Sequence, residues 1–353
     1  MFYDIIFHLY DRPNNLNALI MVVMSRLDET VILNKWLKSL ASKTQGSLGL
    51  LDDAALLNIP ANHELVVTTD MSQEGIHFLP TLRGGLVANK VLAVNLSDLA
   101  AMGATPLCYQ LALGLSDAQD TNWMDSFVVS LAEMQRTYNV GLLGGDTIKQ
   151  SAALTIAITA FGLAPTGQSL LRTGAQIGDD VYVSGTIGDG ALGLAFLQNK
   201  MLEVDSVHSQ FLQHRYWYPT PRIEIGVGLR GLATACMDIS DGLMIDCRKL
   251  CAASNVGMVL EYDLLPLSNA GKWAQQNMPT LFNNCISAGD DYELLFTAPA
   301  NAAEAIQDLA GKCKTAITRI GEVVLGNASN VGGGAILQQN GHELTLTNEG
   351  YVH

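Results

Sequence analysis

Basic residues are scarce in this chain. Of its 353 residues only 20 are Lys or Arg, against 34 Asp or Glu, and the formal net charge is −14. Nucleic acids and anionic membranes attract proteins through basic patches, so this charge balance argues against both as partners. Charged residues of both signs make up only 15% of the chain. The acidic residues therefore do not form a general surface coat, and their positions carry information.

Several chemical signatures are also missing from the sequence. There is no Walker A pattern, no H-E-x-x-H and no G-x-S-x-G, which removes the commonest nucleotide-binding and hydrolase motifs. The cysteines show no C-x-x-C pair and no zinc spacing. We interpret them as reduced thiols used for packing, as is usual in a cytoplasmic protein. They are Cys108, Cys236, Cys247, Cys251, Cys285 and Cys313.

The first 23 residues differ from the rest of the chain. Two short apolar runs are separated by DRPNN, and neither run is long enough to span a bilayer. No basic segment or cleavage site typical of a signal peptide is present. We expect residues 1–23 to be a dispensable leader, with Met21 or Met24 as an alternative start.

The remaining chain alternates strand and helix patterns and predicts an α/β (α+β) protein. The segment HELVVTT is a strand that ends at Asp70, LVANKVLAVNLSDLAAMG has helical spacing, and ALTIAITAFG alternates like a strand. A Pro-, Gly- and Ser-containing linker lies near residue 165, and DDVYVSG and ALGLAFLQNK then predict another strand and helix. The length suits two domains. We place them at residues 24–164 and 165–353, meeting at a cleft.

Carboxylates recur at the ends of the apolar segments. Burying an ionised carboxylate is costly unless it is paired or binds a metal, and few Lys or Arg lie near these motifs. Hard oxygen ligands suit Mg²⁺, and Mg²⁺ held by scattered carboxylates usually accompanies phosphate chemistry. The acids are Asp53, Asp70, Asp98, Asp146, Asp238 and Asp241.

Single motifs leave alternatives open. Thr68 and Thr69 beside Asp70 could present oxygens to a cation or belong to a strand-ending turn. The GGD at 144–146 fits a turn open to a ligand, and GTIGDG could either cradle phosphate or be a structural turn. In MDISDG, Asp238 and Asp241 would share a face if helical, and a helix N-cap is the alternative.

Seven motifs in order resemble the thiamine-monophosphate kinase family. They are DDAALLNIP, TTDMSQEGIHF, VNLSDLAAMGATP, GGDT, LLRTGAQIGDDVYVSG, MDISDGL and AGDDYELLFT, and the likeness runs from about Ser25 to the C-terminus. That family shares a superfamily with aminoimidazole ribonucleotide synthetase and selenophosphate synthetase. The resemblance implies a two-domain fold of that kind, with the N-terminal sheet pairing across a homodimer. It implies ATP-dependent phosphorylation of thiamine phosphate to thiamine diphosphate.

The resemblance also implies roles for individual residues. Those that would bind several Mg²⁺ ions are Asp53, Thr68, Thr69, Asp70, Asp98, Asp146, Asp238 and Asp241. ATP would be contacted by Gly145, Asp146, Arg172 and Ser240, and thiamine phosphate by His77, Asp290 and Tyr351. The chain departs from the family pattern in three places: Leu51 replaces a glycine, Asp290 stands where Glu is frequent, and the end reads GYVH.

The implied reaction agrees with the residue types. The acceptor is a phosphate, largely dianionic at neutral pH, and is already a nucleophile. No general base is needed, and the obstacle is repulsion between two anions, which several Mg²⁺ ions can neutralise. We therefore expect direct transfer in a site rich in Asp, with one Arg and no catalytic His or Lys.

Two other functions compete with this one. The first is a different enzyme of the superfamily, such as an aminoimidazole ribonucleotide synthetase, although EGIHF and AGDDYELLFT favour the kinase. The second is a non-catalytic, metal-dependent nucleotide sensor on the same fold. A degraded set of acids would favour the sensor, and here the set is complete.

Overall fold

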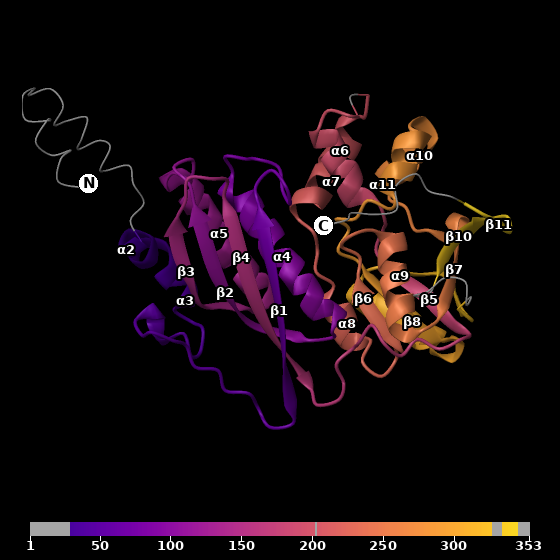
Figure 1. Ribbon diagram of the computed structural model, residues 1–353, viewed down its shortest axis with the longest axis horizontal. Helices are drawn as coiled ribbons and strands as arrows, with labels where there is room; N and C mark the ends of the chain where they lie inside the picture. The colour runs from indigo at the N-terminus through magenta and orange to yellow at the C-terminus, as the bar shows by residue number, and fades with distance from the viewer. Residues whose placement is uncertain (1–28, 202, 327–333, 345–353) are drawn as a thin grey trace, which may run out of the picture.

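The computed structural model describes residues 29–201, 203–326 and 334–344, so the expected leader at residues 1–23 lies outside it. Two β-sheets stand side by side, each with its own helices, and helix α4 (Gly84–Ala101) runs between them (Figure 1). The division agrees with the sequence pattern of two α/β halves, while the predicted boundary at residues 164 and 165 stays a prediction. No helix among the described residues is long and apolar enough to cross a membrane.

The first sheet has four strands in the order β1-β4-β2-β3. Strand β4 is antiparallel to both neighbours, while β2 and β3 are parallel. Every second residue of β4 is buried, which is the alternation that predicted this strand. The order leaves β1 and β3 at opposite edges of the sheet. The strands are β1 (His63–Gln73), β2 (Thr105–Leu115), β3 (Gly141–Lys149) and β4 (Thr155–Pro165).

Helix α4 confirms the helical spacing seen in the sequence. It packs with α5 (Thr121–Tyr138) against the first sheet, and most of its residues are buried. A helix that is apolar nearly all round needs partners on every side. The partner on its other side is the second half: Ala100 and Ala101 pack in a separate cluster with α8 (Ile223–Gly228) and the second sheet.

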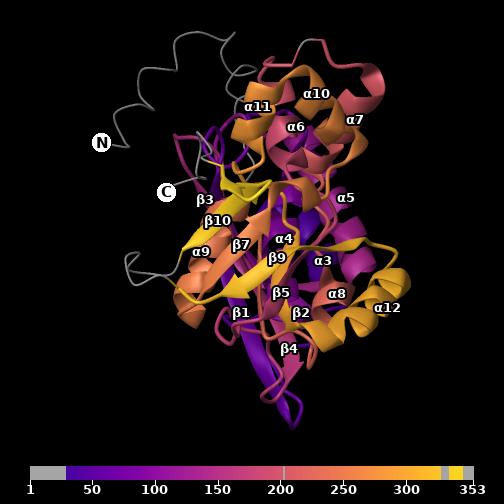
Figure 2. The same cartoon turned by 90° about the vertical axis from the view of Figure 1, so that its right-hand side faces the viewer.

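The second sheet has seven strands in the order β11-β10-β7-β9-β5-β8-β6. Figure 2 shows this sheet from the front, with a group of helices above it. The strands are β5 (Asp179–Ser184), β6 (Ala235–Asp238), β7 (Gly257–Glu261), β8 (Leu294–Pro299), β9 (Ile317–Val324), β10 (Ala335–Gln339) and β11 (His342–Glu343). Helices are α6 (Asp189–Leu197), α7 (Ser206–Trp217), α9 (Leu243–Ser254), α10 (Asn269–Asn277), α11 (Pro279–Cys285) and α12 (Ala303–Cys313).

The remaining elements are short. They are α2 (Glu29–Ile32), the π-helix η1 (Leu33–Leu37), α3 (Lys38–Ala41) and the 3₁₀ turns η2 (Leu48–Leu50), η3 (Tyr262–Leu264) and η4 (Ala300–Ala302). The thiols predicted to serve packing are buried, except for half-buried Cys313.

Two local predictions were wrong. The strand expected to end at Asp70 continues to Gln73, because β1 keeps its pairing with β4 through the Gln73–Thr155 pair. The GGD segment is not a turn: Gly144, Gly145 and Asp146 lie within β3 and pair with β2 next to a register shift. Glycine is needed there for another reason, since a Cβ on Gly145 would come within 1.9 Å of the Leu111 carbonyl oxygen.

Candidate active site

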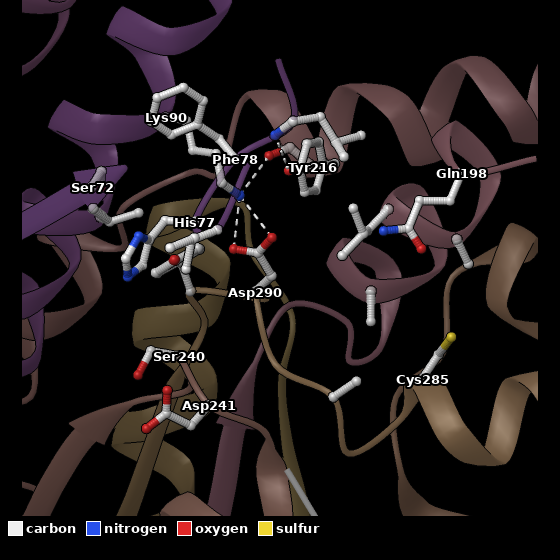
Figure 3. A pocket seen from close by; sticks show the side chains of 18 of the residues that line it. Ser72, His77, Phe78, Lys90, Gln198, Tyr216, Ser240, Asp241, Cys285 and Asp290 are labelled. Atoms are coloured by element: carbon white, nitrogen blue, oxygen red, sulfur yellow. Dashed lines mark hydrogen bonds and ion pairs between the residues drawn. The ribbon is translucent and has the colours of Figure 1, made fainter. Parts of the chain in front are cut away.

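A cavity of about 610 Å³ opens between the two halves of the molecule. Its walls come from β1, α4, α6, the end of α7, the turn after β6 and the segment before β8. Figure 3 looks into it and shows polar side chains from both halves facing one another. The predicted site residues that line it are Asp70, His77, Asp98, Asp238, Ser240, Asp241 and Asp290.

One wall of the cavity is acidic. Asp70 comes from β1, Asp98 from α4 and Asp238 from the end of β6, so three separate elements converge. The hydroxyl of Thr68 donates to Asp98, and the hydroxyl of Ser97 donates to Asp238 at 2.7 Å. These bonds fix the two carboxylates without neutralising them.

The turn that follows β6 resolves the alternatives for MDISDG. Asp238 closes a strand, and α9 begins only at Leu243, so the two acids do not share a helix face. The alternative, a helix N-cap, is not formed by either acid, because Gly242 precedes α9. Instead, one oxygen of buried Asp246 accepts the amides of Ser240, Asp241 and Gly242 at 3.0–3.1 Å. This carboxylate holds the turn that presents Ser240 and Asp241 to the cavity.

The pKa values of the carboxyl groups in the acidic wall reflect their burial and the like charges around them. Burial first, and then the charges of Asp98, Asp246 and Asp70, raise the pKa of Asp238 to about 8. Burial also raises the pKa of Asp98, against the hydrogen bond from Thr68 and the charge of Arg172. Within the described part of the chain, burial therefore outweighs the hydrogen bonds and opposite charge that reach these two carboxylates.

The acidic wall fits Mg²⁺ that is shared with phosphate. Among the described residues no three His, Cys, Asp or Glu are grouped closely enough to hold an ion by themselves. Mg²⁺ usually keeps several waters and takes one or two carboxylates together with substrate phosphates. A loose set of carboxylates and hydroxyls around an open cavity suits this mode of Mg²⁺ coordination better than a closed cage of protein ligands would.

The other predicted acids lie elsewhere. Asp53, Gly145 and Asp146 line a second cavity of about 280 Å³ beside β3. Because β3 and β1 are the two edges of the four-stranded sheet, this second group lies across the sheet from Asp70. One chain therefore does not bring all the predicted metal ligands into a single site.

Three further predicted residues have different placements. Thr69 follows Thr68 on β1 and points to the opposite face, where its hydroxyl bonds that of Thr159 at 2.9 Å. Arg172 is close enough to Asp98 for its charge to lower the pKa of that carboxyl. Tyr351 lies outside the described residues.

His77 lies at the β1 side of the cavity. Its Nδ1 accepts the backbone N–H of Gln73 at 3.0 Å, so the neutral ring carries its proton on Nε2. The bond fixes the ring at the cavity, where Figure 3 shows it.

Asp290 and Asp291 are adjacent in sequence but point to opposite sides. The Asp290 backbone has a left-handed φ of 68°, uncommon for a residue with a side chain, and its N–H donates to the Ser240 carbonyl at 2.8 Å. Asp290 reaches into the cavity. Asp291 is buried, and its two oxygens accept the amides of Gly188 at 2.8 Å and Gly190 at 3.2 Å.

The buried Asp291 decides between the alternatives for GTIGDG. The amides that could have cradled a phosphate at the start of α6 are already occupied by the side-chain oxygens of Asp291. The motif is therefore a structural turn in this chain.

Sequence reasoning missed the cations of the site. The sequence shows few Lys or Arg near the acids and predicted no catalytic Lys, and the motifs that carry the acids gave no sign that two lysines lie beside them in space. Lys90 lines the cavity, and Lys249 bonds both Asp241 and Asp246. A signal for Lys90 was present, since it lies eight residues before Asp98 and both therefore project from one side of α4.

Comparison with known proteins identifies the family. Residues 51–164 match the family model for the AIR synthase related protein N-terminal domain, and residues 176–333 match its C-terminal domain. The thiamine-monophosphate kinase of Escherichia coli K12 is 40% identical over 313 residues, covering 89% of this chain and 94% of that protein. The chain belongs to the thiamine-monophosphate kinase family. This confirms the resemblance carried by the seven motifs.

Solved structures of the family agree with the fold. The thiamine-monophosphate kinase of Stenotrophomonas maltophilia K279a is 37% identical with a TM-score of 0.77, covering 88% of this chain and 96% of that chain. A structure described as AaThiL complexed with AMPPCP and TMP is 29% identical with a TM-score of 0.70, covering 92% of this chain and 97% of that chain. The two-domain AIR synthase-like fold predicted from the sequence is thereby confirmed.

Proposed function

We propose that this chain transfers the γ-phosphate of ATP to thiamine phosphate and so produces thiamine diphosphate. The observation that carries the proposal is the acidic wall of Asp70, Asp98 and Asp238, brought together at an open cavity in a member of this family. The related complex that contains AMPPCP and TMP gives support, since both named ligands match the proposed substrates. A cytoplasmic location, which reduced thiols would suit, belongs to the same proposal.

The reaction needs no covalent enzyme intermediate. A phosphate oxygen of thiamine phosphate attacks the γ-phosphorus of ATP, and the bond between that phosphorus and the β–γ bridging oxygen breaks, releasing ADP. The attacking oxygen is already anionic near neutral pH, so no proton has to be removed first. The protein has to hold two anions in line and prevent their repulsion.

Residues of the acidic wall would hold the Mg²⁺ ions. When bound, these ions offset the negative charge of both phosphate chains. In this proposal the side-chain ligands are those predicted from the sequence except Thr69, whose hydroxyl faces away from the cavity: Asp53, Thr68, Asp70, Asp98, Asp146, Asp238 and Asp241. Ser240, Gly145, Asp146 and Arg172 would contact ATP, and His77, Asp290 and Tyr351 would contact thiamine phosphate.

A homodimer would bring the separated acids together. The β3 edge with Asp53 and Asp146 lies across the sheet from the acidic wall, so a second copy could supply it. Strand β1 has a suitable face for pairing: Val67 is 52% exposed and Met71 65% exposed, and both project to the side away from α4. An exposed apolar stripe on a sheet is typical of an interface.

A direct assay tests the function. Purified protein with ATP, Mg²⁺ and thiamine phosphate should form thiamine diphosphate and ADP in equal amounts, measured by chromatography, and chelation of Mg²⁺ should stop both. ADP formation without thiamine diphosphate, or binding of ATP without turnover, would contradict the proposal and favour another enzyme of the superfamily or a nucleotide sensor.

A further inference from the structure

Lys90 is a buried lysine at the junction of the two halves. Its side chain is only 4% exposed, although it projects from α4 toward the cavity (Figure 3). The ammonium donates to both oxygens of Asp290 at 2.7 Å and to the backbone carbonyl of Tyr216 at 3.1 Å. An ammonium has three donors, and here each has an acceptor.

Because the Lys90 donors are all used, this residue does not have a free hydrogen to offer a ligand. Its Nζ also lies 4.1 Å from the centroid of the Tyr216 ring, over a face that favours cations. The Tyr216 hydroxyl in turn accepts the Leu79 amide at 3.1 Å. Lys90 therefore has a fixed place, and any influence on a ligand passes through the carboxylate it holds.

Lys90 can fix the position of the Asp290 carboxylate, since it bonds both carboxylate oxygens. The Asp290 side chain is 20% exposed and opens into the cavity, on a backbone held in the left-handed region. The same cavity contains the carboxylates of Asp70, Asp98 and Asp238. Without Lys90, the Asp290 carboxylate would be repelled by these like charges and would turn away from its present position. The Lys90 ammonium supplies the local charge that keeps Asp290 in place.

The pair also joins the two halves of the molecule. Lys90 belongs to the helix that packs on the first sheet, whereas Asp290 lies in the segment before β8 of the second sheet, and Tyr216 lies in the last turn of α7. Burial lowers the pKa of Lys90, while the charge and hydrogen bonds of Asp290 oppose that shift. The contact thus depends on both partners and on the spacing between the halves.

We propose that Lys90 is a positioning residue for thiamine phosphate, which it affects by holding the Asp290 carboxylate toward the cavity from across the junction. This inference rests on the proposed function. It assigns Lys90 no role at the reacting phosphates, so ATP binding should depend on it little.

A double-mutant cycle tests the inference. The variants are Lys90→Met, Asp290→Asn and the double variant, with Lys312→Met on exposed α12 as the matched control. Each is assayed for kcat and for KM of both substrates, and thiamine phosphate binding is measured by calorimetry. Lys90→Met should raise the KM for thiamine phosphate about tenfold and leave the KM for ATP within about twofold. The control should match the wild type.

The double variant carries the decisive result. If Lys90 acts through Asp290, adding Lys90→Met to Asp290→Asn should change the KM for thiamine phosphate by less than about twofold. Effects that multiply, or an equal rise in the KM for ATP, would overturn the inference. If Lys90→Met fails to fold because it leaves the Asp290 carboxylate unpaired, Asp290→Asn and the double variant remain, and their comparison gives the same answer.

Failure of the proposed function would look different. If the wild-type chain forms no thiamine diphosphate, the kinase assignment is wrong whatever the variants do. If the wild type is active and Lys90→Met behaves like the control, only the role of Lys90 is wrong.

Discussion

Crowded carboxylates dominate this molecule at the scale of single residues. Asp238 has a pKa of about 8, caused first by burial and next by the charge of Asp98. Removing one of these acids relieves its neighbours and at the same time removes a proposed ligand of Mg²⁺. Activity and stability should therefore respond in opposite directions, as is common at functional sites.

The Asp98→Asn variant tests this opposition. Turnover at saturating Mg²⁺ should fall at least ~100-fold, equivalent to roughly 3 kcal/mol of transition-state stabilisation. Without Mg²⁺ the variant should melt roughly 1–3 °C above the wild type, because a like charge is gone. The Thr68 hydroxyl can still donate to the asparagine oxygen. Activity within twofold of the wild type would show that Asp98 is not an essential ligand.

A second residue-scale prediction concerns pH. Burial, and then the charge of Asp189, raise the pKa of Asp291 to about 8, while the amides of Gly188 and Gly190 oppose the shift. Between about pH 4 and pH 8 the folded state therefore holds a proton here that the unfolded state has lost. The stability contributed by Asp291 is full below the unfolded pKa and is lost as the pH rises through the folded pKa.

Asp291→Asn should remove this dependence. The free energy of unfolding of the wild type minus that of the variant should fall as pH rises from 4 to 8, by at most roughly 1.4 kcal/mol per pH unit. Urea denaturation without metal at three pH values measures the difference. A difference that stays constant with pH would mean that Asp291 does not titrate in this range.

Single residues also show where sequence reading succeeds. The expectation that the cysteines serve packing was right for most of them, because apolar neighbours in sequence usually share the core. The orientation of the Asp290 side chain toward the cavity was not predictable. It depends on a left-handed φ at Asp290, and the sequence does not indicate such a φ at a residue other than glycine. The Lys90 contact with Asp290 links residues that are far apart in sequence, so no local pattern contains it.

At the scale of elements, α4 is the central component. It carries Lys90 and Asp98 to the cavity and packs on both sides. On the second side it meets α8, where Gly226 allows a close approach: a Cβ there would lie 2.0 Å from the Ala100 carbonyl oxygen. Because the obstructing atom belongs to the backbone, a change of side-chain rotamer cannot relieve the clash. One helix as a whole would have to shift away from the other.

Gly226→Ala should therefore cost stability and activity together. We expect a loss of about 1–3 kcal/mol in the free energy of unfolding, typical of overpacking. The matched control is Gly311→Ala in α12, where the added Cβ has open space and should stabilise by up to ~1 kcal/mol. Chemical denaturation of both variants gives the comparison. Equal effects of the two substitutions would show that α4 and α8 are not tightly packed at Gly226.

Element prediction succeeded where periodicity was strong. The alternation in β4 and the helical spacing in α4 are both imposed by burial that repeats along the element. It failed at GGD, where glycines indicated a turn but serve a strand in close contact with its neighbour. Leu51 in place of the family's glycine is accommodated, because its φ of −109° is one that any residue adopts.

At the scale of the whole molecule, the sheet separates two groups of acids. The sequence correctly indicated two α/β halves meeting at a cleft, because strand and helix patterns alternate throughout. It could not indicate that Asp53 and Asp146 lie at the far edge, since strand order is set by pairing between distant segments. If the proposed dimer forms, each active site would combine acids from two chains, and this can be tested with mixed dimers.

Mixed dimers should recover activity. Asp70→Asn and Asp146→Asn alone should each be inactive, but co-expression should yield heterodimers with one intact site of two. With random pairing, activity should return to about one quarter of the wild-type value per chain. Assay of the co-purified mixture against each parent measures this. If every site were built within one chain, the mixture would stay as inactive as its parents.

The sharing of α4 between two cores bears on how such a protein could be recombined during evolution. Ala100 and Ala101 complete a cluster whose other members, such as Ile225 and Phe296, belong to the second half. A chimera joined at the linker after β4 would take the end of α4 from one parent. The residues of the second half that pack against that end would come from the other parent. Exchange of halves between relatives should therefore succeed only where the end of α4 and the residues that pack against it match. The two halves would then be inherited together, despite their separate sheets.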